Sequence, residues 1–432
     1  MLQTFRQIAA LLFGITILTL GMGMLYVLIV VRAKEAGFSS QWIGIIQSAY
    51  QVGWLVAALI IPSLIHRVGH IRVFAAVAAL GSGVILTHLL FIEEISWTVE
   101  RIFMGICTAG LMIVAESWLN DMSDNKGRGK IMAIYTIISW GAPVIGMWLL
   151  RFGDISSSFF FLLSSIIISI GVLPILLSAS RTPSLITVER FNLRKLYEIT
   201  PVGVAGTFLS GLCHGAFFAA VAIYATSLEL SVREVTNINA LAILIGVLLQ
   251  WPLGMLSDHY DRRTILIISA AMTALSASVF AMYASMDVTT IYVAVSCMSA
   301  FSLGLYSQCI SHANDNLNPS QIVSATGSLV LVYGVGYAIT PVISGYLISQ
   351  SPVYFYWVIG ACSTLLAVFV MYRTMRKAPP EHQGELIAMS SASPYTPVVV
   401  AAEEWSDDVE IMDNRSEKTR QGDAGKNRGN RS

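Results

Sequence analysis

Long apolar stretches alternate with short polar loops along most of this chain. Each apolar stretch runs for about twenty residues, the length an α-helix needs to cross the hydrocarbon core of a bilayer. This length criterion predicts about twelve membrane spans. The predicted spans are Ile8–Val31, Trp42–Ile65, Val73–Ile92, Trp97–Leu119, Ile131–Leu150, Phe159–Ser178, Pro201–Ser227, Ile238–Leu256, Thr264–Ala284, Thr290–His312, Val323–Ile348 and Tyr354–Tyr372.

The spans divide into two groups of six, joined by a polar and basic segment. We therefore predict an all-α membrane protein whose twelve transmembrane helices form two pseudo-symmetric six-helix bundles. Residues 1–178 and 200–373 are the expected bundles, and residues 179–199 are the expected cytoplasmic linker, with a short amphipathic helix near Phe191–Tyr197. Residues 374–432 are polar and charged, with an acidic cluster, and we expect a disordered cytoplasmic tail.

Two kinds of internal repeat support the division into halves. A charged hairpin, Gly254–Arg263, separates the eighth and ninth spans, and a weaker copy, Pro62–Arg72, separates the second and third. The fourth and tenth spans each end in Asn-Asp, at Asp121 and at Asp315. Repeated halves are typical of transporters that hold a solute near the bilayer midplane and rock one half against the other.

Basic residues are distributed unequally between the loops, which predicts the orientation of the chain. The loops after odd-numbered spans carry few Lys and Arg. The loops after even-numbered spans carry many more, at Arg67, Arg72, Lys126, Arg128, Lys130, Arg181, Arg190, Arg194, Lys195, Arg262 and Arg263. Because basic loops stay on the cytoplasmic side, we expect the even loops and both termini in the cytoplasm.

Composition agrees with a membrane protein and excludes several other classes. Hydrophobic residues make up 55% of the 432 positions and charged residues 12%, against about 25% charged in soluble domains. The net charge of zero gives no reason to expect a nucleic-acid partner. The five cysteines lie in apolar runs without a CxxC pair, so we expect no disulfide framework, no metal site and no cofactor. We expect a monomer in contact with lipid.

Several motifs resemble those of the major facilitator superfamily, and the likeness covers about residues 1–376. The fourth span carries Arg-x-x-x-Gly at Arg101 and Gly105. The loop after the eighth span carries the glycine, aspartate and basic pair of the family's hairpin motif, at Gly254, Asp258, Arg262 and Arg263. The resemblance implies a solute transporter of the inner, or plasma, membrane. No GxxxxGK[ST] loop occurs, so we expect no ATP-binding domain and transport driven by a gradient.

The chain also departs from the family pattern. Pro62 replaces the glycine and His66 the aspartate of the first-half hairpin, which predicts a weaker or pH-sensitive latch there. Ala142-Pro143 only loosely resembles the fifth-span motif of antiporters. The bacterial branch called YcaD-like is similar to this chain in three segments, Ala115–Asn120, Gln250–Gly254 and His312–Asn314.

Ionisable groups inside a membrane span are costly, so each is a functional candidate. Arg101 and Glu116 lie on one stripe of the fourth span that should face the bundle interior. Arg101 either binds an anionic or polar solute group, tunes a proton site, or is a structural arginine satisfied by carbonyls or by Glu100. Glu116 either carries a proton, since burial favours the neutral carboxyl, or pairs with Arg67 or Arg72 as a gate latch. The latch is the interpretation we favour, because Glu116 lies near the loops.

The hairpin residues are expected to gate rather than to do chemistry. Asp258 caps a helix N-terminus in the opposite half, or caps its own hairpin locally. The predicted gating residues are Asp258, Arg262, Arg263, Arg67, Arg72, Glu116 and Asp121.

The remaining candidates are polar or aromatic residues on inward faces. His214, midway along the seventh span, is either a packing residue or a proton or solute contact. The expected cavity lining is mixed aromatic and amide rather than strongly charged: Thr19, Gly23, Tyr26, Gln47, Tyr50, Gln51, Asn239, Gln250, Tyr306, Gln308, Tyr333 and Tyr337.

We therefore predict a secondary transporter that moves a small organic solute by alternating access, with protons as the expected coupling ion. An antiporter and a symporter both fit this sequence, and the aromatic cavity favours efflux. An uncoupled facilitator and a transporter-like receptor that signals through its tail stay open as alternatives. An enzyme is disfavoured because no HExxH, GxSxG or paired intramembrane carboxylates occur.

Overall fold

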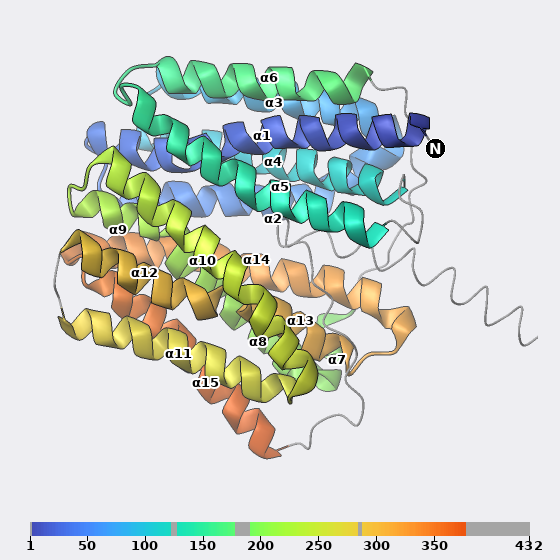
Figure 1. Cartoon of the computed structure of the whole chain (residues 1–432), viewed down its shortest axis with the longest axis vertical. Coiled ribbons are helices and arrows are strands. Elements are labelled where there is room, and N and C mark those ends of the chain that lie inside the picture. The colour runs from blue at the N-terminus through green and yellow to red at the C-terminus, as the bar shows by residue number, and fades with distance from the viewer. Residues whose placement is uncertain (1, 122–127, 178–190, 284–286, 377–432) are drawn as a thin grey trace, which may run out of the picture.

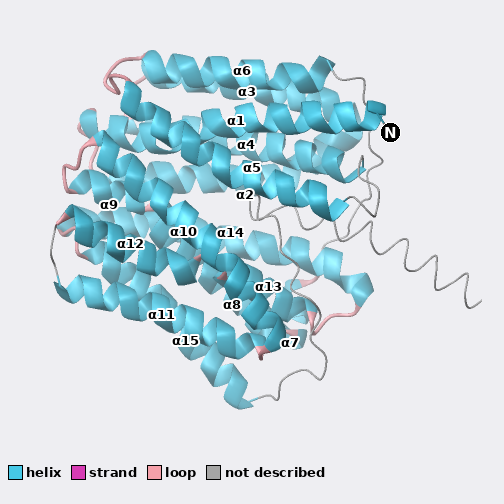
Figure 2. Ribbon diagram, viewed as in Figure 1, coloured by secondary structure: helices cyan, strands magenta, loops and turns pink. Residues whose placement is uncertain are grey.

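The computed structural model describes residues 2–121, 128–177, 191–283 and 287–376, and these residues are helical without any strand (Figure 2). Twelve helical segments within this part are long and apolar enough to cross a membrane, which confirms the all-α prediction of twelve spans. The elements are α1 Leu2–Glu35, α2 Ser40–Val68, α3 His70–Leu90, α4 Glu94–Asp121, α5 Arg128–Leu149, η1 Leu150–Phe152, α6 Phe159–Leu177, α7 Leu193–Ile199, α8 Pro201–His214, η2 Gly215–Ala219, α9 Val221–Ser227, α10 Val232–His259, α11 Arg262–Tyr283, α12 Val288–Ser302, α13 Leu305–Asn314, α14 Pro319–Gln350 and α15 Tyr354–Arg376.

Two membrane spans are built from more than one element. The seventh span consists of α8, a π-helical turn η2 and α9, and the tenth consists of α12 and α13. A π-helical turn widens the helix by one residue and leaves carbonyl groups outside the regular ladder. Such breaks are tolerated inside a membrane where neighbouring helices satisfy the freed groups.

The helices pack as two bundles, with α1–α6 above and α8–α15 below in the view of Figure 1. In the first bundle α1 packs on α5 and α6, and α4 packs on α2 and α3. In the second bundle α8 packs on α13, α14 and α15, and α11 packs on α12 and α15. The predicted domain limits stay predictions, because residues 178–190 and the expected tail from 377 onward lie outside the described residues. The predicted linker helix corresponds to α7.

The two bundles meet most extensively along α2 and α14. At this contact Gly44 of α2 lies against the backbone of Pro341 and Gly345 of α14. A Cβ atom on Gly44 would lie 2.2 Å from the Pro341 carbonyl oxygen, so the close approach requires glycine. The contact lies near the loops that follow odd-numbered spans, which we call the odd-loop end; the opposite side is the even-loop end.

Polar contacts between the bundles also lie toward the odd-loop end. The Tyr26 hydroxyl of α1 donates to the carbonyl of Phe218 in η2. The Arg151 guanidinium in η1, which directly follows α5, donates to the side-chain oxygen of Asn237 in α10. From these contacts α5 and α10 diverge toward the even-loop end, on the right in Figure 1. The bundles are thus joined at one end of the molecule.

Candidate functional site

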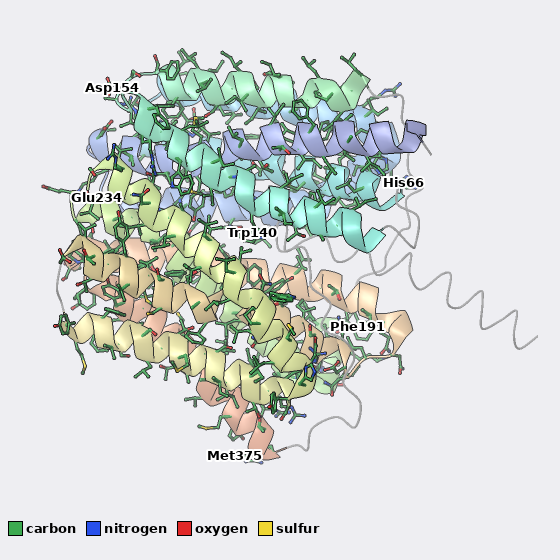
Figure 3. The ribbon with its side chains drawn as sticks, in the orientation of Figure 1. His66, Trp140, Asp154, Phe191, Glu234 and Met375 are labelled. Atoms are coloured by element: carbon green, nitrogen blue, oxygen red, sulfur yellow. The ribbon has the colours of Figure 1, made fainter. Side chains whose placement is uncertain are left out.

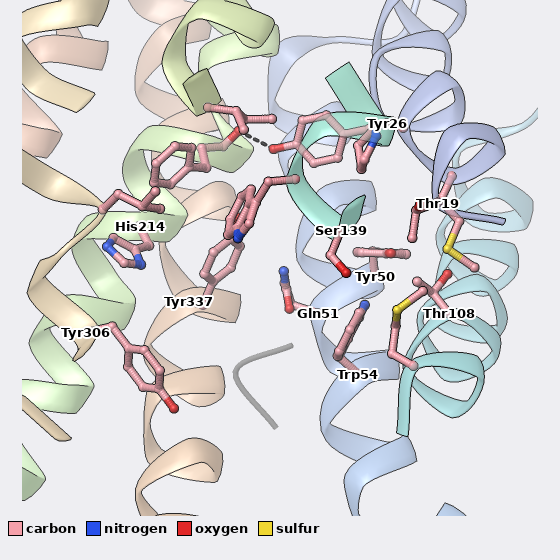
Figure 4. A pocket seen from close by; sticks show the side chains of 18 of the residues that line it. Thr19, Tyr26, Tyr50, Gln51, Trp54, Thr108, Ser139, His214, Tyr306 and Tyr337 are labelled. Carbon is pink, nitrogen blue, oxygen red and sulfur yellow. Dashed lines mark hydrogen bonds between the residues drawn. The ribbon is translucent and has the colours of Figure 1, made fainter. Parts of the chain in front are cut away.

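A cavity of about 250 Å³ lies between the two bundles, and both contribute to its wall (Figure 4). Helices α1, α2, α4 and α5 form one side; α8, η2, α10, α13 and α14 form the other. The lining residues are Thr19, Met22, Gly23, Tyr26, Tyr50, Gln51, Trp54, Thr108, Met112, Ser139, Trp140, Pro143, Met147, His214, Phe218, Ile243, Gln250, Leu303, Tyr306, Ser307, Tyr333 and Tyr337.

Aromatic rings face the cavity from both sides. In the first bundle the Tyr50 and Trp54 rings lie edge to face, with centroids 6.4 Å apart. In the second bundle the Tyr333 ring lies 4.3 Å from that of Tyr306 and 6.0 Å from that of Tyr337. Offset and edge-to-face ring clusters of this kind present flat apolar faces together with hydroxyl groups.

His214 is held in a fixed orientation at the end of α8, one residue before the π-helical turn. Its Nε2 lies 2.8 Å from the Ser302 carbonyl oxygen, which only accepts, so this nitrogen carries the hydrogen. Its Nδ1, 2.8 Å from the Tyr333 hydroxyl, therefore accepts a hydrogen bond from Tyr333. The neutral imidazole thus orients the Tyr333 ring in the cavity wall.

Arg101 is buried beside the wall rather than in it. Its side chain donates to the Gln47 amide oxygen at 2.8 Å, and its guanidinium carbon lies 4.2 Å from the centre of the Tyr50 ring. The Oε2 of neighbouring Glu100 lies 3.1 Å from the Nδ1 of His88, which also contacts the Val84 carbonyl at 2.9 Å. Among the described residues no carboxylate forms an ion pair with Arg101, and its Nε–H has no acceptor there. Gln47 therefore supports Arg101 and does not line the cavity as predicted.

Glu116 is fully buried in α4, toward the even-loop end. One carboxyl oxygen accepts a hydrogen bond from the Tyr135 hydroxyl of α5, and the other has no partner within the described part of the chain. The predicted ion pair of Glu116 with Arg67 or Arg72 is absent here. The physical reason is the direction in which the side chains point. Arg67 and Arg72 are exposed, whereas Glu116 is buried and points from α4 toward Tyr135 of α5.

The second-half hairpin forms an ion-pair cluster within its own bundle. The Nε of Arg262 lies 2.8 Å from the Asp315 carboxylate at the end of the tenth span, and another nitrogen lies 3.3 Å from Asp258. Asp258 thus pairs locally instead of capping a helix of the opposite bundle. Asp261 takes the capping role, because its carboxylate accepts from the backbone N–H of Arg263 at 3.1 Å. The side chain of Asp121, the first-half counterpart of Asp315, lies outside the described residues.

Most of the predicted lining residues do lie in the wall, but two besides Gln47 do not. Asn239 is buried and donates to the Val235 carbonyl of its own helix. Gln308 is buried against α11, where its amide lies 3.5 Å from the Ser269 hydroxyl. Helix α10 packs on α12 within the second bundle, and α13 packs on α8 and α11. Both side chains are therefore enclosed inside that bundle and do not reach the cavity. Those predicted residues that line the cavity are Thr19, Gly23, Tyr26, Tyr50, Gln51, His214, Gln250, Tyr306, Tyr333 and Tyr337.

Several lining residues were not predicted. Trp54 lies one helical turn after Tyr50, and Thr108 and Met112 lie on the stripe between Arg101 and Glu116, so helical periodicity was an available signal. The α5 contribution had no polar signal strong enough to find it. It consists of Ser139, Trp140, Pro143 and Met147, and Trp140 lies on the side of α5 that faces the second bundle (Figure 3).

Comparison with known proteins decides the family. The sequence profile of the Major Facilitator Superfamily matches residues 11–196 and 203–407, which span both bundles. The chain belongs to this superfamily. The "Uncharacterized MFS-type transporter YcaD" of Escherichia fergusonii is 23% identical over 376 residues, covering 86% of this chain and 96% of that protein. The protein of the same description from Salmonella arizonae is 26% identical over 348 residues, covering 78% and 87%.

Solved structures of this superfamily share the fold. A mutant of the nucleoside transporter NupG superposes with a TM-score of 0.72 at 13% identity, covering 85% of this chain and 99% of that one. A D-xylose–proton symporter superposes with a TM-score of 0.58 at 14% identity, covering 85% and 96%. This member of the superfamily is therefore a secondary transporter rather than an enzyme, a multi-pass protein of the inner membrane, and it resembles the YcaD branch.

Proposed function

We propose that this transporter carries a small organic solute through the central cavity by alternating access, with protons as the coupling ion. The observation that carries the proposal is the cavity itself, whose wall is shared by two bundles that are joined toward the odd-loop end by the contacts described above. A rocking motion about such a site exposes it to the two sides of the membrane in turn.

The conformation described here is then the state closed at the odd-loop end. The Lys/Arg bias of the loops assigns that end to the outside, with both termini in the cytoplasm. The cavity in this state communicates with the cytoplasmic side. In this proposal the transporter acts as a monomer in the lipid.

Glu116 is the proposed proton-binding group. It is a fully buried carboxyl with a single hydrogen-bond partner, Tyr135, and a lone buried carboxyl in a membrane span is far cheaper to keep protonated than ionised. Its position at the contact of α4 and α5 allows the bundle's rearrangement to change its access to water. Protonation and movement of the bundle are thereby linked.

One observation favours an uncoupled facilitator as a second candidate. The cavity lining contains no carboxylate among the described residues, and Glu116 lies outside that lining. Solute binding and proton binding are therefore not in direct contact.

Flux into proteoliposomes distinguishes the candidates. Purified full-length protein is reconstituted, and uptake of a labelled solute is followed with and without an imposed pH gradient. Coupled transport predicts accumulation against the solute gradient that collapses when a protonophore is added. Equilibration alone, unaffected by the protonophore, identifies a facilitator, and saturable binding without flux identifies a receptor.

A further inference from the structure

We propose that the solute is a small aromatic anion: one or two fused rings that carry a single carboxylate or comparable acidic group. This inference rests on the proposed function and specifies its substrate class. Three features of the cavity carry it, namely its rings, its lack of acidic side chains and the unpaired arginine beside it.

The first feature is the arrangement of rings. Tyr50 and Trp54 face the cavity from α2, and Tyr306, Tyr333 and Tyr337 face it from the other bundle (Figure 4). A flat solute placed between these faces gains ring–ring contact from both halves at once. The cavity volume of about 250 Å³ is slightly below the roughly 300–1,000 Å³ of pockets for drug-sized ligands, so the solute has one or two rings.

The second feature is the charge of the wall. None of the cavity-lining residues among those the structure describes is Asp, Glu, Lys or Arg. A cationic solute would lose its hydration without gaining a carboxylate partner, which is strongly unfavourable in a low-dielectric site. The wall therefore discriminates against cations.

The third feature is Arg101, which is 3% exposed and pairs with no carboxylate in the described structure. Its guanidinium lies against Tyr50, and the Nε–H lacks an acceptor. The adjacent acid, Glu100, has its Oε2 3.1 Å from His88 on α3 and forms no ion pair with Arg101 in the described structure. A buried cation without a counter-charge creates a positive potential over the nearby wall, and an anion bound there supplies the missing charge.

Uncharged amide groups complete the site. Gln51 and Gln250 line it from α2 and α10, and the Ser139 and Ser307 hydroxyls line it from α5 and α13. These groups accept or donate hydrogen bonds without adding charge. They suit ring substituents such as hydroxyl or ring nitrogen, while the acidic group is directed toward Arg101.

The test is a binding series in which ring and charge vary separately. Purified full-length protein is titrated calorimetrically at neutral pH with indoleacetate, its neutral isostere indoleacetamide, the cation tryptamine and the non-aromatic anion cyclohexylacetate. We expect indoleacetate to bind at least about tenfold more tightly than the amide or cyclohexylacetate, which corresponds to about 1.4 kcal/mol, and tryptamine not to bind. Benzoate extends the series to a single ring. Naphthoate extends it to two fused rings that carry the carboxylate directly.

Two variants connect the preference to its proposed cause. Arg101→Gln should weaken indoleacetate to the affinity of indoleacetamide and leave the amide within about twofold, so that amide binding reports an intact cavity. Arg101→Lys keeps the charge and should retain most of the anion preference, which also covers the case in which the glutamine variant does not fold. Arg194→Gln, at an exposed position of α7, is the matched control and should change nothing.

Each outcome decides between the inference and the proposed function. Equal affinity for tryptamine and indoleacetate, or failure of indoleacetate, benzoate and naphthoate all to bind, overturns the substrate class. An anion preference that survives in Arg101→Gln overturns the role of Arg101. If the aromatic anion binds with the expected preference but is not moved in proteoliposomes, the substrate class stands and the transport function fails. If the protein transports an unrelated solute and binds no aromatic anion, the transport function stands and the substrate class fails.

Discussion

The two bundles have the same helical plan but place their charges differently. The first bundle buries charged or ionisable groups within its spans: Arg101, Glu116 and the His88–Glu100 pair. In the described second bundle, charged side chains lie at or near helix ends, above all in the Arg262–Asp315 cluster. Its described interior is polar without Asp, Glu, Lys or Arg, and His214 is held there by the Ser302 carbonyl and the Tyr333 hydroxyl. A duplicated scaffold can thus assign proton and charge chemistry to one half and ring recognition to both.

The two charged hairpins also differ, but here it is the second bundle that buries a charged residue. In the second bundle Arg262 is 1% exposed and ion-paired, whereas in the first bundle Arg67 and Arg72 are exposed. The first hairpin has His66 where the second has Asp258. The first-half counterpart of Asp315, the main partner of Arg262, is Asp121, whose side chain lies outside the described residues.

The largest expected effect comes from removing the buried acid of the first bundle. Glu116→Gln keeps the shape and the acceptor for Tyr135 but cannot exchange a proton. We expect flux driven by a pH gradient to fall by about 100-fold or more, with solute affinity nearly unchanged. Tyr135→Phe, which only removes the hydrogen-bond donor, should reduce coupled flux much less. Unchanged coupled flux in Glu116→Gln would show that the proton site lies elsewhere.

The second effect tests the ion-pair cluster of the second bundle. Asp315→Asn leaves the buried Arg262 without its main counter-ion and should cost about 3 kcal/mol in free energy of unfolding, measured by denaturant titration in detergent micelles. Asp258→Asn removes a partly exposed partner and should cost about 0.5 kcal/mol. Arg67→Gln in the first hairpin serves as the control and should have no measurable effect. Equal losses in both hairpins would abolish the contrast between them.

The third effect concerns the contact that joins the bundles. Gly44→Ala places a methyl group against the Pro341 carbonyl, and overpacking of this kind costs about 1–3 kcal/mol. Because the penalty applies only while α2 and α14 touch, the variant should shift the population away from closure at the odd-loop end. Labelling of an introduced cysteine, Asn237→Cys, should become faster. Gly83→Ala in α3, where a Cβ meets no atom within 4 Å, is the control and should leave the labelling rate unchanged.

The smallest effect tests the uncharged interior of the second bundle. Tyr333→Phe removes the hydrogen bond to His214, and one such bond contributes about 1 kcal/mol. Solute affinity should fall by about fivefold with no change in proton coupling. His214→Gln combined with Tyr333→Phe should lose less than the sum of the single changes, since both break the same contact. A loss of coupling in Tyr333→Phe would assign the second bundle a proton role as well.

Hydropathy was sufficient for the twelve spans because length and apolar content are all that a bilayer requires. It also located much of the cavity, since the Tyr50 and Tyr333 faces carry polar groups among apolar ones. It failed for Gln308, because a helix packed on several sides has more than one inward face. It failed for the partner of Glu116 because Tyr135 lies 19 positions away and no pattern in a single sequence encodes that contact.

The π-helical turn at Gly215–Ala219 makes the seventh span sensitive to its exact residue count. Removing one residue from this turn would restore an ordinary helical winding with almost the same length. Side chains beyond the turn would keep nearly their present direction, because a π-helical turn takes up its extra residue within one turn. The Phe218 carbonyl would return to the helix ladder, out of reach of Tyr26. A single-codon deletion would therefore leave the protein inserted and folded yet without the Tyr26–Phe218 contact that joins the bundles toward the odd-loop end.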